Sequence, residues 1–149
     1  MALGWKLVID SADPYRQAAF WAAALEYELE DNSALIERLL GLGVVDESLV
    51  REVDGRKYWV TGAAARHPDD PFEEESGVGL GRRLLFQLVP EPKSGKNRLH
   101  VDVHAGPGER EAVVARLEKL GATFVRTVEE HGGTWALMLD PEGNEFCVA

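Results

Sequence analysis

The fold is decided by the stretch Leu99-His100-Val101-Asp102-Val103-His104. Apolar and ionisable residues alternate in it with a period of two, which predicts a β-strand over residues 98–104. A row of three titratable groups on one strand face is typical of a solvent-facing surface or of the wall of a polar pocket. The apolar face would carry Leu99, Val101 and Val103, and the ionisable face would carry His100, Asp102 and His104.

The composition is that of one globular domain without disulfides, which we expect to span residues 1–149. Of the 149 residues, 45% are hydrophobic, and a folded domain of this size buries about 68–70% of its unfolded surface. The lone Cys147 has no partner for an internal disulfide, and the N-terminus lacks a signal-peptide pattern. We therefore expect a reducing, cytoplasmic location.

The charge narrows the class of partner. The formal net charge of −10 repels nucleic acid phosphates and anionic lipids. No stretch approaches the roughly 20 apolar residues of a membrane span. We expect no nucleic acid and no membrane as partner, and instead a small molecule or another protein.

The strand at 98–104 opens a module, residues 98–149, with the order β-α-β-β-β. Apolar spacing through Leu117 predicts a helix that Gly121 ends, followed by three strands. A first module at residues 5–90 repeats this order, with a strand at 5–10 and a helix that Asp13 caps. Its Leu7-Val8-Ile9-Asp10 aligns with Leu99-His100-Val101-Asp102, and residues 90–97 form the linker between modules.

Two segments interrupt the first module. Ser33 and Asp46 are predicted to cap two short helices, which we interpret as an insertion at about residues 31–56. The strand-like residues 57–60 follow the hairpin turn at Asp54-Gly55. Residues 62–82 then lose all periodicity, and their glycines lack the flanking strand and helix of a phosphate-binding loop. We expect residues 62–82 to form a mobile surface loop.

Three pieces of the sequence resemble the glyoxalase/bleomycin-resistance/extradiol-dioxygenase superfamily, the vicinal oxygen chelate proteins, and most of all its glyoxalase-like subgroup. The resemblance covers residues 5–30 and 83–148. It implies an α+β fold, in which two βαβββ modules form curled mixed sheets around a cleft, and a homodimer. The pieces are Asp13-Pro14 with the helix to Leu25, the strands Leu85–Pro90 and Leu99–Asp102, and the turn Asp140–Phe146.

The resemblance also implies places for metal ligands, on the first and last strand of each module. These places fall on Lys6, Gln87, His100 and Cys147. Imidazole and thiolate are good ligands for zinc, iron or nickel, whereas the Lys6 ammonium has no lone pair. A shifted site of His100, Asp102 and Gln87 is the alternative. The expected cofactor would be a divalent Zn, Ni, Fe or Mn ion.

Three functions stay open at this point. In the first, a small organic molecule binds in the cleft, and His100 or Asp102 acts on it directly or through a metal, as in a lyase, an isomerase or an oxygenase. In the second, the chain binds or sequesters a small molecule without metal or turnover, as resistance proteins do. The third is a dimeric scaffold that contacts a protein through residues 31–60. The predicted pocket residues are Lys6, Asp10, Gln87, His100, Asp102 and His104.

Overall fold

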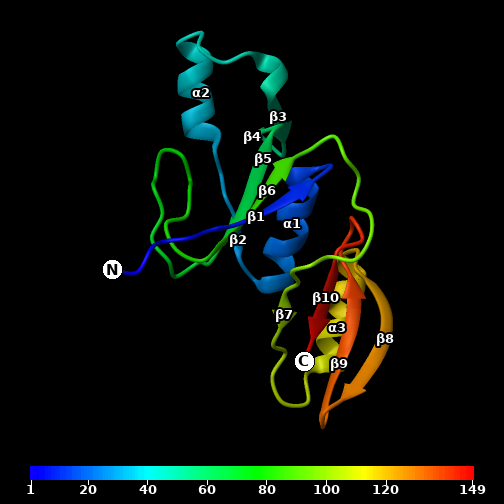
Figure 1. The fold of residues 1–149 in the computed structure, drawn as a ribbon. Helices are drawn as coiled ribbons and strands as arrows, with labels where there is room; N and C mark the ends of the chain where they lie inside the picture. Colours follow the sequence, from blue (N-terminus) through cyan, green and yellow to red (C-terminus); the bar gives the residue numbers. More distant parts are fainter. The chain divides into compact units, whose positions relative to one another are not determined.

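Figure 1 shows the computed structural model of the chain, which describes all residues from Met1 to Ala149. The chain divides into two compact units, Met1–Glu91 and Pro92–Ala149. Each unit contains a four-stranded mixed sheet and a helix that connects its first two strands. The predicted α+β class with two βαβββ modules is confirmed. No helix has both the length and the hydropathy that a membrane span requires.

The sheet of the first unit has the strand order β1-β6-β5-β2. The first strand β1 (Leu7–Ser11) runs parallel to the last strand β6 (Arg83–Leu88). Strand β5 (Gly62–Arg66) is antiparallel to β6 and to the short edge strand β2 (Glu28–Leu29). Helix α1 (Pro14–Leu25) packs on β5 and β6, and the predicted Asp13 cap accepts a hydrogen bond from the Arg16 amide.

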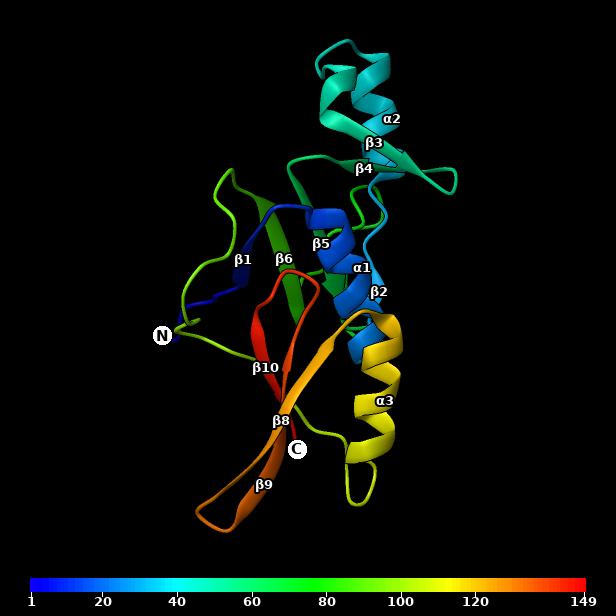
Figure 2. The same cartoon turned by 90° about the vertical axis from the view of Figure 1, so that its right-hand side faces the viewer.

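The second unit repeats this topology, with the order β7-β10-β9-β8 (Figure 1). Figure 2 shows that β8 and β9 form a long hairpin. Its first and last strands are again parallel, and the other pairings are antiparallel. The internal repeat predicted from the sequence is therefore a repeat of strand order. The elements are β7 (Asp102–Val103), α3 (Arg110–Leu120), β8 (Thr123–Glu130), β9 (Gly133–Leu139) and β10 (Glu145–Val148).

The prediction of a strand over residues 98–104 is wrong in length, because only Asp102 and Val103 form β7. This strand lies at the edge of its sheet and pairs only with β10, where Asp102 faces Cys147 and Val103 faces Val148. The residues before it belong to the irregular linker segment, so Leu99 is 76% exposed rather than on an apolar face.

The insertion contains a hairpin as well as two helices. The predicted cap at Ser33 is wrong, because Ser33 is the first residue of α2 and Asn32 occupies the cap position. The Ser33 hydroxyl instead accepts a hydrogen bond from the Lys57 amide. The turn at Asp54-Gly55 is confirmed, with both residues at positive φ. The hairpin pairs only with itself. The elements are α2 (Ser33–Gly41), the 3-10 helix η1 (Glu47–Leu49), β3 (Val50–Val53) and β4 (Arg56–Trp59).

The prediction of a surface loop over residues 62–82 is wrong for residues 62–66, because these residues form the inner strand β5. Three consecutive alanines of this strand, Ala63 to Ala65, are at most 4% exposed between β6, β2 and α1. Alanine is depleted in strands, so the sequence carries no local strand signal here. Small side chains at these positions leave room for the helix to approach the sheet.

We predict that Ala65→Leu destabilises the fold. Ala65 is fully buried, and added methylenes in a well-packed core cost about 1–3 kcal/mol of unfolding free energy. Urea unfolding followed by circular dichroism measures this loss. The matched control is Ala34→Leu on the exposed surface of α2, which should change the unfolding free energy by less than about 0.5 kcal/mol. Equal effects of the two substitutions would contradict the packing argument.

Candidate metal and ligand site

The parallel pairing of first and last strands places polar residues at equivalent positions in the two units. Asp10 and Gln87 are partners across β1 and β6, and Asp102 and Cys147 are partners across β7 and β10. A buried phenylalanine precedes both Gln87 and Cys147. Because successive strand residues point to opposite faces, the polar side chains lie on the face of each sheet that is turned away from the core phenylalanine.

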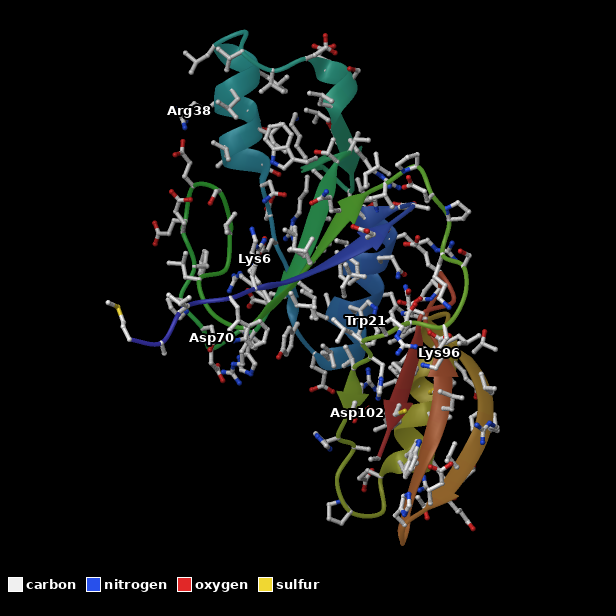
Figure 3. All side chains as sticks on the ribbon, in the orientation of Figure 1. Lys6, Trp21, Arg38, Asp70, Lys96 and Asp102 are labelled. Atoms are coloured by element: carbon white, nitrogen blue, oxygen red, sulfur yellow. The ribbon has the colours of Figure 1, made fainter.

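In the second unit, three possible metal ligands converge. The ligand atoms of His100, Asp102 and Cys147 all lie within 4.8 Å of one another. His100 Nε2 is 3.3 Å from Asp102 Oδ1, and both side chains are about half exposed. Cys147 is partly buried. Figure 3 labels Asp102 of this cluster. Two of the three side chains of the cluster are therefore accessible to solvent.

The electrostatic environment of Cys147 keeps its thiol protonated. Burial raises the pKa of the thiol, and the charge of Asp102 and a hydrogen bond to that residue raise the pKa further. The ammonium of Lys96 acts in the opposite direction but does not outweigh these effects. A cation bound here would have to displace the thiol proton, as cysteine ligands require.

The donor set fits a divalent metal ion. It combines an imidazole nitrogen, a carboxylate oxygen and a sulfur, which zinc, iron and nickel accept, while manganese favours oxygen ligands. Three protein ligands leave coordination positions for an organic molecule or water, as in catalytic zinc sites.

The other predicted site residues are all exposed. Lys6 and Gln87 are part of the first unit and are exposed; Lys6 precedes β1, and Gln87 lies beside the exposed Asp10. His104 follows β7 and is exposed. The structure therefore brings together His100 and Asp102 from the predicted pocket with the predicted ligand Cys147.

Sequence reasoning missed the residues that fasten the linker beside this cluster. The Glu145 carboxylate accepts a hydrogen bond from the Asn97 amide at 3.1 Å and pairs with the Lys93 ammonium at 3.0 Å. Asn97 Nδ2 also donates to Asn144 Oδ1 at 3.0 Å. Glu145 stands two residues before Cys147 on β10, hence on the same face. The alternation of strand residues between the two sheet faces is the sequence signal that could have placed Glu145 on the face of Cys147.

The comparisons with known proteins agree on one fold. Residues 6–149 match the model of a protein family that is described as "Glyoxalase-like domain". No curated protein matches the sequence. Similar solved structures include the fosfomycin resistance protein FosX from Mesorhizobium loti, with a TM-score of 0.60 and 12% identity over 99% of this chain and 91% of that one.

Two further solved structures extend the similarity. A glyoxalase/bleomycin resistance protein/dioxygenase family enzyme from Burkholderia phytofirmans PsJN has a TM-score of 0.58 and 15% identity, covering 96% of this chain and 94% of that one. The bleomycin-binding protein of Streptomyces verticillus, solved with copper(II)-bleomycin, has a TM-score of 0.50 and 14% identity, covering 100% and 96%. At such identities the similarity establishes the fold and leaves the chemistry open.

We predict that Glu145→Ala releases the linker. Loss of a hydrogen bond to a charged group should accelerate hydrogen exchange of the Asn97 amide by about tenfold, measured by NMR. Glu129→Ala, on exposed β8, is the control and should leave this rate unchanged.

The protection should also depend on pH. Burial opposes ionisation of Glu145, but its hydrogen bonds and the Lys93 ammonium outweigh burial and lower its pKa. A lowered folded pKa means that the carboxylate protects Asn97 at neutral pH and that protection is lost as the pH falls through that lowered value. Protection that disappears above the usual range of a glutamate pKa would contradict this assignment.

Proposed function

Because the chain belongs to the glyoxalase-like domain family of the vicinal oxygen chelate superfamily, we propose that it binds a small organic molecule at a divalent metal ion. His100, Asp102 and Cys147 would hold this ion. The observation that carries the proposal is the convergence of three chemically different donors within 4.8 Å on the open face of the second sheet. The strand pairing of Asp102 with Cys147 fixes two of the three donors relative to each other.

The residues of the cluster have distinct tasks in this proposal. A bound divalent ion would supply Lewis acidity, polarising an oxygen of the organic molecule. Asp102 lies close enough to His100 to orient its ring before any ligand arrives. With one oxygen of Asp102 on the ion, its second carboxylate oxygen could accept a proton from the bound molecule, which is the role of a general base. These roles are consistent with a lyase, isomerase or oxygenase.

A second candidate function is metal-free binding of a small molecule without turnover. Two observations favour it: the thiol of Cys147 is held in its protonated form, and the Lys96 ammonium acts on it electrostatically. A positive charge near the cluster opposes the binding of a cation. The bleomycin-binding protein of Streptomyces verticillus, which shares the fold, is named for binding alone.

Metal analysis of the full chain without a histidine tag tests the first function. We expect about one divalent ion per chain and a rise in thermal stability with zinc, nickel or iron(II). At a metal concentration of about 100 times the Kd, the unfolding free energy should rise by about 2.7 kcal/mol. His100→Ala and Asp102→Asn should remove both the bound ion and the stabilisation, because each deletes one of three ligands.

His104→Ala is the matched control, since His104 is an exposed histidine of the same segment outside the cluster. It should retain the ion. If His104→Ala lost as much metal as His100→Ala, binding would reflect surface histidines rather than the cluster. If the unaltered chain contained no metal and no melt shifted, the metal-dependent function would be rejected in favour of the metal-free one.

A further inference from the structure

A cavity of about 540 Å³ lies wholly within the first unit and shares no residue with the metal and ligand site. Its volume falls in the range of small-molecule sites. It opens at the β2 edge of the sheet, where the start of α2, strand β4 and the loop at residues 67–82 meet. The residues that carry the argument are Glu28, Asp31, Arg56, Arg66, Phe72 and Glu74.

The charges that line the cavity leave one carboxylate in surplus. Arg66 donates a hydrogen bond to Glu28, and the Arg56 Nε lies 3.6 Å from Asp31 Oδ2. Each arginine is therefore paired with one carboxylate, although the Nε atom of Arg66 is buried without a hydrogen-bond partner. Glu74 is exposed and makes no hydrogen bond or ion pair. A ligand in this cavity would therefore meet a net negative charge located at Glu74.

The neighbours of Glu74 are already engaged. Glu73 accepts a hydrogen bond from the Ser76 hydroxyl, and Glu75 is paired with Arg38 of α2. All three side chains of the acidic run are exposed, but two of the three carboxylates already have partners. Its middle residue alone is available to a ligand.

Phe72 supplies an aromatic surface that is already fixed in place. The Arg66 guanidinium carbon lies 3.8 Å from the centroid of the Phe72 ring, yet Phe72 remains 42% exposed. An isolated β-bridge pairs Phe72 with Gly79, and the Glu73 amide donates a hydrogen bond to the Val78 carbonyl. These contacts fix the backbone that carries the Phe72 ring. Beside Phe72, the apolar lining is completed by Leu29 and Ala34.

The wall of the cavity is preformed. Gly77 has a φ of +73°, and a Cβ at this position would lie 2.2 Å from the Asp31 carbonyl oxygen, so only glycine allows the loop to approach α2. The buried Asn32 amide donates a hydrogen bond of 2.7 Å to the Ser76 carbonyl. The loop and the start of α2 are therefore fastened to each other, and a ligand would not have to order them.

We propose that this cavity binds a small aromatic cation, with its ammonium group at Glu74 and its ring against Phe72. An anion is disfavoured, because the three carboxylates of the lining outnumber its two arginines and the net charge of the chain is −10. A neutral aromatic compound would leave Glu74 unpaired. The proposal does not depend on the function proposed for His100, Asp102 and Cys147.

An NMR titration of the full chain with benzylammonium tests this site. We expect saturable shifts of the Phe72, Glu74 and Gly77 amides, weaker binding of neutral benzyl alcohol, and no saturable shifts with benzoate. Glu74→Gln should weaken benzylammonium by about threefold, the size of one exposed charge pair. Glu47→Gln, an exposed carboxylate on η1, is the control and should leave the affinity unchanged.

A charge reversal sharpens the test. Glu74→Lys should abolish benzylammonium binding and admit benzoate, whereas His100→Ala should bind benzylammonium like the unaltered chain. Equal binding of benzoate and benzylammonium to the unaltered chain would overturn the proposal. It would also be overturned if Glu47→Gln weakened benzylammonium as much as Glu74→Gln, because the attraction would then be a property of the whole surface.

Discussion

The parallel pairing of the first and last strand in each module is the constraint on which the rest of the structure depends. Parallel strands cannot be joined by a short turn, so each module must pass through a helix and two further strands before its last strand returns beside its first. This return makes partners of residues that are far apart in the sequence, Asp10 with Gln87 and Asp102 with Cys147. Both cross-strand pairs of candidate site residues arise from this geometry.

Local signals in the sequence were sufficient for the elements that are stabilised locally. The Asp13 cap with Pro14 predicted the start of α1, and Asp54-Gly55 predicted the turn between β3 and β4. Strand β5 carries no such signal, because Gly62-Ala63-Ala64-Ala65 is defined by its neighbours on both sides and by the helix above it. Its strand conformation is a tertiary effect, which periodicity cannot reveal.

The same distinction applies to the candidate site. The alternation of apolar and ionisable residues predicted that His100 and Asp102 share a face. Their atoms Nε2 and Oδ1 lie 3.3 Å apart, even though the strand itself is shorter than predicted. The proximity of Cys147 depends on strand register, which the sequence alone suggested only through the family resemblance. The attachment of the linker to Glu145 depends on a loop conformation, and no periodic pattern encodes one.

The two modules have kept one topology while their polar positions have diverged in chemistry. The strand register puts Val8, rather than the predicted Lys6, in the place of His100, because Asp10 pairs with Gln87 as Asp102 pairs with Cys147. Gln87 occupies the place of Cys147. Valine has no donor atom and a neutral amide is a weak ligand, so the first module cannot form a ligand cluster like that of the second.

The first module instead contains a buried ion pair between Glu30 and Arg83. The Glu30 carboxylate also accepts a hydrogen bond from the Gly79 amide of the loop at residues 67–82. A buried pair is weak evidence for added stability but fixes a conformation when both partners are satisfied. The buried Glu30–Arg83 pair of the first module therefore positions a loop, whereas the half-exposed His100 and Asp102 of the second module are available for a ligand.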